Sequence, residues 1–475
     1  MTHYPELVAL GYLATVVLFI FGIRFLSSPR TALRGNRLAA LGMLIALIVT
    51  FIGLGTLPWE AVVPALVVGA ILGAGAARAV RMTAMPQMVA LFNGMGGGAV
   101  ALIGADEFLR RSGHLAPGVA TFAPGRSVPI MLGCLIGSIS FAGSLVAFSK
   151  LQELMRGTPL TFAGQRLANL GLLVVILALG VVVVAVTSSP WLFLAFEILA
   201  LVLGVAFVLP VGGADMPVII SLLNSFTGVA AAVSGFVLDN EVLIVAGALV
   251  GASGTILTQL MSRAMNRSLF NVLFSAFGQA PAVAGAGGGA GADSRPVHSV
   301  TAEDVALLLG YAHLVVFVPG YGMAVAKAQH VVRELATHLE KRGVTVKYAI
   351  HPVAGRMPGH MNVLLAEADV PYPQLYAMDD INPEFSRTDV AVVIGANDVT
   401  NPAARSNPGS PIYGMPILNV DQAANVVVLK RSMNPGFAGI DNELYYNPKT
   451  LMLFGDARES VMQLLAALKE LVPSH

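Results

Sequence analysis

The chain has 475 residues, of which 56% are hydrophobic and 12% are charged, and its mean hydropathy is +0.75. Soluble domains carry about 25% charged residues, so this composition excludes an entirely soluble protein and predicts that most of the chain lies in lipid. A formal net charge of +1 argues against a nucleic-acid-binding protein, which normally needs a clustered basic surface. Cys134 is the single cysteine, so an intrachain disulfide is excluded and nothing indicates an oxidising compartment.

Nine apolar segments fill the N-terminal part of the chain, and each is long enough to cross a bilayer, which takes roughly 20 apolar residues in a helix. They are Glu6–Leu26, Arg37–Leu54, Ala61–Ala77, Met85–Ile103, Ser127–Phe148, Leu167–Val186, Trp191–Leu209, Met216–Val237 and Glu241–Met261. The first segment is too long for the apolar part of a signal peptide and has no basic stretch before it, so we expect a spanning helix there.

Lysine and arginine in the connecting loops predict the orientation of the spans, because short cytoplasmic loops are enriched in these residues. Basic residues follow the first, third, fifth and ninth segments, namely Arg30, Arg34, Arg78, Arg81, Lys150, Arg156, Arg166, Arg263 and Arg267. The loop after the fourth segment breaks the pattern with Arg110, Arg111 and Arg126. The pattern predicts an N-terminus outside and a C-terminal domain in the cytoplasm.

Several polar side chains lie within or beside the predicted spans, where an unpaired polar group costs several kcal/mol. Asn93 and Asn224 lie at similar depths, so they either bond each other, hold water or join helices. Asp215 precedes the eighth segment, where an aspartate also serves as an ordinary helix cap. Glu197 is the one carboxylate well inside a segment, and none of the nine histidines lies in one. The usual near-neutral proton carrier is therefore absent from the predicted bundle.

Glycines in the segments have the spacing that lets membrane helices approach closely. The pairs are Gly69 with Gly73, Gly133 with Gly137, and Gly247 with Gly251. A denser cluster in the fourth segment, Gly94, Gly96, Gly97 and Gly98, has two open interpretations: close packing, or a kink beside a water-filled gap.

The second half of the chain has the pattern of a water-soluble α/β domain. Residues 275–299 contain the run Ala284–Ala292, which is too rich in glycine and alanine to form a core and predicts a flexible linker. Short β-rich runs then alternate with helical patterns, at Leu314–Val318, Val344–Ile350, Val390–Ile394, Ile417–Val420, Val426–Leu429 and Leu451–Phe454, and one helix is expected from the first run to about Arg342. We therefore expect a polytopic α-helical membrane bundle followed by a doubly wound, Rossmann-like nucleotide-binding domain, with ligands at the carboxyl ends of its strands.

The motif Gly320-x-Gly322-x-x-Val325 follows the first run and opens the expected helix. Glycines at these positions allow a tight turn and a close approach of backbone N–H groups to a pyrophosphate. The third position is valine in place of glycine or alanine, so the strand-turn-helix context carries the interpretation. The motif predicts a dinucleotide site.

The dinucleotide is predicted to be NADP(H). A site for NAD normally has an acidic residue at the end of the second strand, but here Ile350 and His351 stand there. Lys430 and Arg431, with Ser432, follow a later strand at a ligand-facing end. Paired cations beside a hydroxyl suit a 2′-phosphate.

Two further loops at predicted strand ends are unusual for a scaffold. The loop from His351 to His360 contains two prolines and two glycines, with Arg356 available to a phosphate. Asn397 and Asp398 follow the strand that ends at Ile394, where they suit the nicotinamide or a ribose hydroxyl. Both residue types are also turn formers, so a role in the turn alone stays open.

Together these segments resemble the β subunit family of proton-translocating NAD(P) transhydrogenase. The matching stretches are Gly212–Ser225, Gly247–Leu257, Ala264–Ser268, Pro319–Gln329, Ile350–Ala366, Gly395–Ala403 and Lys430–Met433. The resemblance implies a bacterial inner-membrane enzyme with a proton-conducting domain at 1–274, a linker at 275–299 and an NADP(H)-binding domain at 300–475. It also implies that NAD(H) binds to a partner alpha subunit, and that the heteromeric complex is a dimer surrounded by membrane lipid.

The resemblance assigns residues to the two sites. The NADP(H) site would comprise Gly320, Tyr321, Gly322, Met323, Ala324, Val325, His351, Val353, Ala354, Gly355, Arg356, Met357, Gly395, Ala396, Asn397, Asp398, Lys430, Arg431, Ser432, Gly436, Phe437, Gly455 and Asp456. The proton pathway would include Asn93, Asp215 and Asn224. No side chain is expected to act as a chemical catalyst or to hold a metal, because the hydride chemistry belongs to the cofactors.

Two positions depart from the family pattern. Asn93 stands where many members carry a histidine, and an amide does not titrate. Either ordered water bridges that position, or a helix of the partner subunit supplies the ionisable group. Phe437 stands where a tyrosine is common, so a hydroxyl contact to the cofactor is absent.

The alternative function is an ion channel or transporter regulated by a nucleotide-binding domain. The Gly-Tyr-Gly triplet at 320–322 lies in the soluble half of the chain, so it is not a potassium-type selectivity filter. Hydride transfer to or from an NAD-binding partner distinguishes the enzyme from this alternative.

Overall fold

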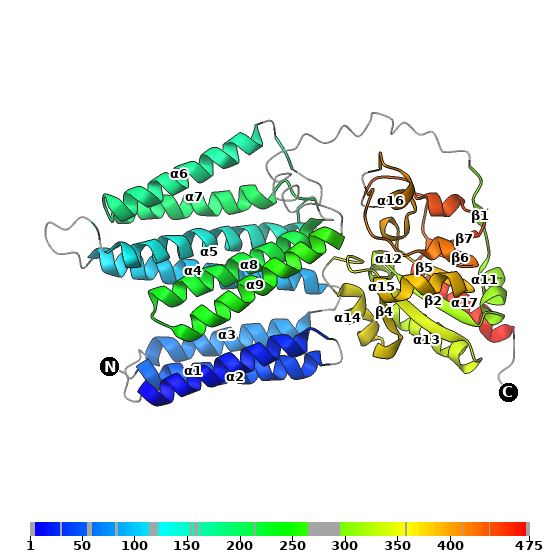
Figure 1. Ribbon diagram of the computed structural model, residues 1–475, viewed down its shortest axis with the longest axis horizontal. Helices are drawn as coiled ribbons and strands as arrows, with labels where there is room; N and C mark the ends of the chain where they lie inside the picture. Colours follow the sequence, from blue (N-terminus) through cyan, green and yellow to red (C-terminus); the bar gives the residue numbers. More distant parts are fainter. Residues whose placement is uncertain are drawn as a thin grey trace. The chain divides into compact units, whose positions relative to one another are not determined.

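The structure is a computed structural model and describes the chain except for residues 1–4, 29–30, 55–58, 81–83, 114–120, 122, 153, 156–159, 163, 213–214, 265–294, 357–358, 411, 437 and 472–475. Most of the predicted linker, as well as Met357 and Phe437, lies outside the described residues. The chain divides into two compact units, one helical and one α/β, which are drawn in Figure 1 and described in turn.

In the part of the chain that the structure describes, nine helices are long and apolar enough to cross a membrane. They are α1 (Pro5–Leu26), α2 (Ala32–Leu54), α3 (Trp59–Ala79), α4 (Met85–Gly113), α5 (Pro124–Leu151), α6 (Gln165–Ala185), α7 (Pro190–Val208), α8 (Met216–Val237) and α9 (Glu241–Ala264). Each corresponds to one predicted segment, so the prediction of a helical membrane bundle is confirmed.

Helix α4 is longer than predicted, because it continues from Ile103 to Gly113. Two ion pairs with helical i,i+4 spacing join residues of this extension. Arg110 Nε lies 2.9 Å from the Asp106 carboxylate, and Arg111 pairs with Glu107. Such pairs stabilise a polar helical turn by a few tenths of a kcal/mol each, so the helix persists beyond its apolar stretch.

The central helix α5 packs closely against α4 through glycines. A Cβ atom added at Gly137 would lie 2.8 Å from the Gly97 carbonyl oxygen, and one added at Gly98 would lie 2.9 Å from the Phe141 ring. Helices α8 and α9 approach in the same way, since a Cβ at Gly247 would lie 2.7 Å from the Gly228 carbonyl oxygen. The glycine cluster of α4 is therefore explained by packing. A Cβ atom added at Gly69 or at Gly73 of α3 would meet no described atom within 4 Å.

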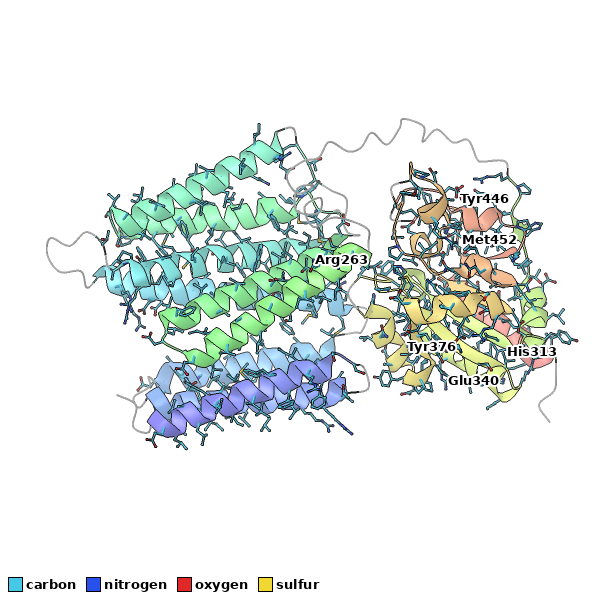
Figure 2. The ribbon with its side chains drawn as sticks, viewed as in Figure 1. Arg263, His313, Glu340, Tyr376, Tyr446 and Met452 are labelled. Atoms are coloured by element: carbon cyan, nitrogen blue, oxygen red, sulfur yellow. The ribbon has the colours of Figure 1, made fainter. Side chains whose placement is uncertain are left out.

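The α/β unit is built on a fully parallel sheet with the strand order β1-β7-β6-β5-β2-β3-β4. The strands are β1 (His298–Ser299), β2 (Leu314–Pro319), β3 (Thr345–Ile350), β4 (Leu375–Ala377), β5 (Val390–Ile394), β6 (Asn425–Lys430) and β7 (Thr450–Phe454). In Figure 2 the labelled Tyr376 belongs to β4 and Met452 to β7, towards the two edges of the sheet. Counted from β2, the order is 3-2-1-4-5-6, the doubly wound arrangement with its switch point between β2 and β5.

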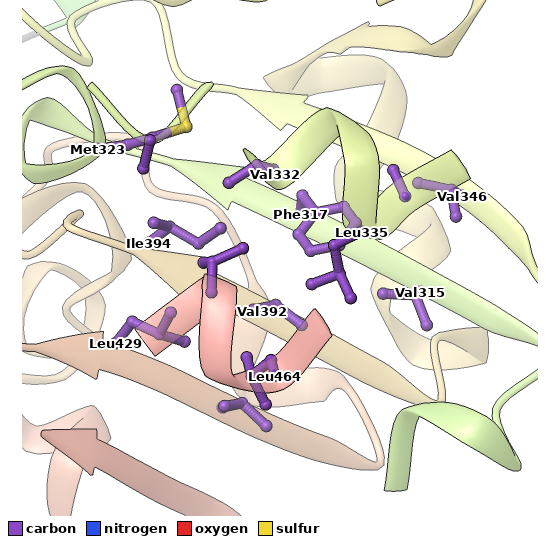
Figure 3. Close-up of a cluster of buried hydrophobic side chains, with 14 of the residues drawn as sticks. Val315, Phe317, Met323, Val332, Leu335, Val346, Val392, Ile394, Leu429 and Leu464 are labelled. Atoms are coloured by element: carbon purple, nitrogen blue, oxygen red, sulfur yellow. The ribbon is translucent and has the colours of Figure 1, made fainter. Parts of the chain in front are cut away.

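Alternate residues of the strands belong to two separate cores, one on each face of the sheet. Val315 and Phe317 of β2 pack with helices α11 (Ala302–Gly310), α13 (Gln329–Lys341), α14 (His360–Glu367) and α17 (Ala457–Glu470) (Figure 3). Val316 and Val318 pack on the opposite face with Phe385 and the segments around it. Burial on both faces explains why these strands are continuous apolar runs.

The observed elements differ from the predicted ones at several places. The apolar run Ile417–Val420 is not a strand but leads into a 3-10 turn at Val420–Gln422. The expected single helix to Arg342 is wrong: it is divided into α12 (Tyr321–Val325) and α13, and Lys327 between them has a φ of +51°. Strands β1 and β4 were not predicted, and β1 lies within the stretch assigned to the linker.

We expect Gly247→Ala to destabilise the bundle, because its methyl group would overlap the backbone of Ala232 and of Gly228 on α8. Overpacking of this kind typically costs about 1–3 kcal/mol. The matched control is Gly171→Ala in α6, where an added Cβ meets no described atom within 4 Å and alanine is the better helix former. Thermal unfolding of the two purified variants in detergent measures the difference in their midpoints. Equal midpoints would contradict the close packing of α9 on α8 at Gly247.

Candidate functional site

A pocket of about 210 Å³ opens where four parallel strands end. It is lined by residues at the end of β6 and in the segments that follow β2, β5, β6 and β7: Gly322, Gly395, Ala396, Asn397, Leu429, Lys430, Arg431, Ser432, Asn434, Gly455 and Ala457. The carboxyl ends of strands beside the switch point are where doubly wound folds bind their ligands. Eight of the eleven lining residues belong to the set that the sequence assigned to the cofactor: Gly322, Gly395, Ala396, Asn397, Lys430, Arg431, Ser432 and Gly455.

The loops after β2 and β5 interlock at the switch point through their backbones. The Gly320 N–H donates to the Ile394 carbonyl and the Gly322 N–H to the Gly395 carbonyl, both at 2.9 Å. A Cβ at Gly322 would lie 2.7 Å from Gly395 Cα, and Gly395 itself has a φ of +66°. Contact between the two loops therefore requires these glycines, and the two N–H groups are already used within the fold.

The other residues of this turn have different positions. Met323 and Ala324 are buried in the core beneath the pocket, whereas Val325 is exposed. Tyr321 opens α12, and the Arg356 guanidinium stacks on its ring at 4.5 Å from the centroid. This stacking brings the loop after β3 against the turn after β2.

The loop after β3 begins and ends on a buried histidine. His351 accepts the Val353 N–H through Nδ1 at 3.3 Å, and its Nε2 lies 2.8 Å from the Pro416 carbonyl, so Nε2 carries the proton. His360 accepts the Arg356 N–H through Nδ1 at 3.0 Å. Burial lowers the pKa of His351 to about 4, and burial with the nearby Arg356 charge does the same for His360. Both rings are therefore neutral supports of the loop.

Backbone geometry fixes the rest of this loop. The Ala354 N–H returns to the His351 carbonyl at 3.0 Å, which closes a turn around Val353. Gly355 has a φ of +110° and packs on the His360 ring, where a side chain would collide with the ring. None of these described residues lines the pocket.

The segment after β6 lies across the loop after β5. The Ala438 N–H donates to the Asp398 carboxylate at 3.0 Å. One end of the Asn397 side-chain amide lies 2.7 Å from the Gly436 N–H and 3.2 Å from Lys430 Nζ. Because both neighbours are donors, that end is the amide oxygen. Asn397 and Asp398 thus do more than form a turn, since each also holds the backbone of another loop.

The two cations after β6 differ in their surroundings. Lys430 Nζ donates to the Asn434 carbonyl and lies 4.8 Å from the centroid of the Tyr445 ring. Burial lowers the pKa of Lys430, and the charges of Asp441 and Asp398 partly oppose that shift. Arg431 is exposed at the pocket rim beside Ser432. Arg431 is therefore the more accessible of the two cations to a ligand anion.

The loop after β7 contributes backbone atoms to the pocket and no charged side chain to its lining. Gly455 lines the pocket, and its N–H donates to the Lys430 carbonyl at 3.0 Å. Asp456 caps α17, because its carboxylate accepts the Arg458 N–H at 3.0 Å. Capping of α17 therefore accounts for the position of the Asp456 side chain.

The polar residues of the helical unit form contacts between α4, α5 and α8. The Asn93 amide donates to Ser144 Oγ at 2.9 Å and to Ser140 Oγ at 3.3 Å. Ser140 Oγ lies 2.6 Å from Thr227 Oγ1 and 2.9 Å from the Leu223 carbonyl. Asn224 does not bond Asn93. Asn93 therefore joins helices through a cluster of hydroxyl groups.

Two carboxylates of the helical unit, Asp215 and Glu197, are buried and half-buried respectively. Asp215 stands at the start of α8 and is buried, but its side chain does not cap the helix. Glu197 of α7 accepts a hydrogen bond from Ser138 of α5. Ordinary helix capping therefore does not account for Asp215. No group of three or more His, Cys, Asp or Glu side chains among the described residues is arranged to hold a metal.

Comparison with known proteins identifies the family of the chain. The model of the NAD(P) transhydrogenase beta subunit family matches residues 8–467. The chain belongs to this family. Two curated relatives from Rhodospirillum rubrum, both named NAD(P) transhydrogenase subunit beta, are each 49% identical over 468 residues, which cover 98% of this chain and 100% of the relative.

Membership in the transhydrogenase beta subunit family makes the chain part of an oxidoreductase, and the family is one of proton-translocating transhydrogenases. The nine apolar helices agree with a multi-pass membrane protein. The word beta implies an alpha subunit as partner. The enzyme hypothesis is thereby favoured over a nucleotide-regulated channel.

Sequence reasoning did not find every residue at the site of this transhydrogenase subunit. Leu429, Asn434 and Ala457 line the pocket, while Asn442 and Tyr445 lie behind Asn397. Asn434 and Ala457 stand within a few residues of assigned positions, so their closeness to a strand end is the signal that indicates them. Asn442 and Tyr445 are distant in sequence from Asn397 and carry no local signal.

We expect the stability of the chain to fall as the pH decreases from about 6.5 towards 4, because an unfolded histidine binds a proton there and buried His351 does not. The expected loss from His351 at pH 5 is about 2 kcal/mol. His351→Asn keeps an acceptor for the Val353 N–H but cannot be protonated, so its unfolding midpoint should change less between pH 7.5 and 5. The exposed His330→Asn is the control, and a wild-type pH response in His351→Asn would contradict the assignment.

Proposed function

We propose that this chain binds NADP(H) and conducts protons, and that inward proton movement drives hydride from NADH on an alpha subunit to NADP⁺ on this chain. The two cofactors supply the hydride chemistry when bound, since NADH becomes NAD⁺ as NADP⁺ becomes NADPH. The task of this chain is to bind, orient and release its nucleotide. Coupling to protons requires that two states of the chain differ in their affinity for that nucleotide.

One observation carries the choice of NADP(H): the pocket has a cationic rim at the end of β6. Arg431 and Ser432 border the pocket beside Lys430. A guanidinium with a hydroxyl group suits a 2′-phosphate.

The place of the cations also sets the direction of the nucleotide on the sheet. A 2′-phosphate at the end of β6 puts the adenosine half over β5, β6 and β7. The pyrophosphate then crosses the switch point at Gly322 and Gly395, and the nicotinamide half extends towards Tyr321 and Arg356. We assign the site residues named from the sequence to this path, including Met357 and Phe437 outside the described residues.

The size of the pocket supports a site that changes shape. Sites for small molecules measure about 300–1,000 Å³, whereas this pocket has about 210 Å³. It therefore accommodates part of a dinucleotide as it stands. Full binding requires that the segment crossing the loop after β5 moves outward.

For the proton path we propose the hydroxyl cluster around Asn93, together with Asp215 and Asn224. Asn93 does not titrate, so the proton passes through water held by Ser140, Ser144 and Asn93, or an ionisable side chain of the alpha subunit enters beside them. The side-chain amide of the half-buried Asn224 makes no hydrogen bond within the described part of the chain, which leaves it available to such a group.

The arrangement in the cell follows from the loop charges and the family. We propose a bacterial inner membrane, an N-terminus outside and a cytoplasmic NADP(H) domain at 300–475, joined by the linker at 275–299 to the membrane domain at 1–274. The full complex would be a dimer of the heteromeric unit, because the alpha subunit must present NADH to the domain that binds NADP⁺.

The coupling is tested with the purified complex of beta and alpha subunits in liposomes, by measuring NADP⁺ reduction by NADH with and without an imposed proton gradient. An inward gradient should accelerate the reaction, and equal rates would remove the coupling. Asn93→Ala should lower the gradient-driven rate and leave NADP⁺ affinity near that of the wild type. Unchanged turnover in Asn93→Ala would show that Asn93 has only a packing role.

Nucleotide choice is tested with Arg431→Ala. A charged hydrogen bond contributes about 1.5–3 kcal/mol, so the preference for NADP⁺ over NAD⁺ should fall by about 10- to 100-fold. Arg387→Ala is the control, because Arg387 is exposed and precedes the amino end of β5, away from the pocket. Titration of both nucleotides by calorimetry measures the ratio of their affinities. An unchanged ratio for Arg431→Ala would show that Arg431 does not bind the 2′-phosphate.

A further inference from the structure

The segment after β6 is fastened over the β5 loop at three backbone atoms. We call residues 434–436 and 438 the strap. Lys430 Nζ holds the Asn434 carbonyl, the Asn397 amide oxygen accepts the Gly436 N–H at 2.7 Å, and the Asp398 carboxylate accepts the Ala438 N–H at 3.0 Å. Every one of these fastenings joins a side chain of the proposed cofactor site to the strap backbone.

The strap also packs tightly on the side chains that fasten it. A Cβ added at Gly436 would lie 2.6 Å from Asp398 Oδ1 and 2.8 Å from the Asn397 amide. The position therefore has no room for a side chain while the strap is fastened. A shift of Asn397 or Asp398 would be transmitted directly to the strap.

Two buried residues fix the Asn397 amide from behind. The Tyr445 hydroxyl lies 2.8 Å from the amide end that faces away from the strap. The Asn442 side chain donates to the Asn397 backbone carbonyl at 3.0 Å. Asn442 and Tyr445 are each 1% exposed, and neither lines the pocket.

The orientation of the amide follows from these neighbours. Burial raises the pKa of Tyr445, so its hydroxyl group keeps its proton and can either donate or accept. With the amide oxygen turned to Gly436 and Lys430, the amide nitrogen donates to the Tyr445 hydroxyl. Loss of that hydroxyl would leave a buried amide N–H without its acceptor, which favours rotation of the amide and loss of the Gly436 contact.

We propose that Tyr445 and Asn442 are positioning residues of the nucleotide site, which hold Asn397 so that the strap stays fastened and bound NADP(H) leaves slowly. The inference rests on the proposed function, because it assumes that NADP(H) occupies the pocket beneath the strap. The strap must open for the whole dinucleotide to enter, since the pocket holds only part of it. Tyr445 and Asn442 then influence the rate of opening without touching the ligand.

The test is Tyr445→Phe in the full-length chain, with the dissociation rate of NADP⁺ and NADPH measured by stopped-flow displacement. Phenylalanine keeps the ring under Lys430 and removes only the hydroxyl group. We expect dissociation to become about tenfold faster, as loss of one hydrogen bond to a buried amide predicts. The unfolding midpoint should change little, which distinguishes positioning from general destabilisation.

The neighbouring Tyr446→Phe is the matched control. Tyr446, labelled in Figure 2, directs its hydroxyl group to the Asp441 carboxylate at the surface. Its loss should leave nucleotide release unchanged. A second arm combines Tyr445→Phe with Asn397→Ala, where the tyrosine change should add nothing further because the amide through which it acts is gone.

The outcomes separate the two proposals. If wild-type protein binds NADP(H) and Tyr445→Phe releases it no faster than Tyr446→Phe, the positioning role is wrong and the proposed function stands. Additive effects of Tyr445→Phe and Asn397→Ala would also contradict it. If the wild-type chain binds no NADP(H) at all, the proposed function fails and this inference fails with it.

Discussion

The contact between the loops after β2 and β5 is the constraint on which the α/β unit depends. Two backbone hydrogen bonds, from Gly320 and Gly322 to the β5 end, join the strands on either side of the switch point. Side chains at Gly322 or Gly395 would force the loops apart. Because the pocket lies directly over this contact, the same glycines that close the backbone also bring the β6 and β7 loops to a common edge.

The helical unit depends on a comparable close approach, with α5 in the middle. Glycines on α4 and α5 let the two backbones meet, which places Asn93 within reach of Ser140 and Ser144. Lys150 at the end of α5 donates to the Leu209 carbonyl and, at 2.8 Å, to the Val211 carbonyl, so it satisfies the C-terminal end of α7. One helix thus carries both the polar cluster and the support for the turn that leads to Asp215.

Hydropathy and turn chemistry predict the large elements of this protein well, because each depends on local sequence. All nine spans and the strands β2, β3, β5, β6 and β7 correspond to predicted runs. The run Ile417–Val420 has the apolar pattern of a strand, but in the fold Leu418 and Val420 fill the core beside Phe385 without pairing to the sheet. The break at Lys327 depends on how α12 packs, which a helical pattern does not reveal.

The candidate site could be predicted at positions where the residue type alone indicates the chemistry. It could not be predicted at positions where the role of a side chain depends on its contacts in the fold. The glycines, Lys430 and Arg431 predict a phosphate site by residue type and position. The commitment of Lys430 to the Asn434 carbonyl depends on contacts formed only in the folded domain. The same holds for the buried rings of His351 and His360, which look like ligand contacts in the sequence but support a loop in the fold.

The polar end of α4 has a mechanical consequence for the membrane domain. A helix of 29 residues extends about 44 Å at 1.5 Å per residue, while the hydrocarbon layer is about 30 Å thick. The ion-paired turn from Asp106 to Arg111 must stay in the headgroup region or in water, so it acts as a stop that prevents α4 from sliding along its axis. With α4 held at a fixed height, Asn93 can change its neighbours only when a helix turns about its own axis or shifts sideways in the bilayer.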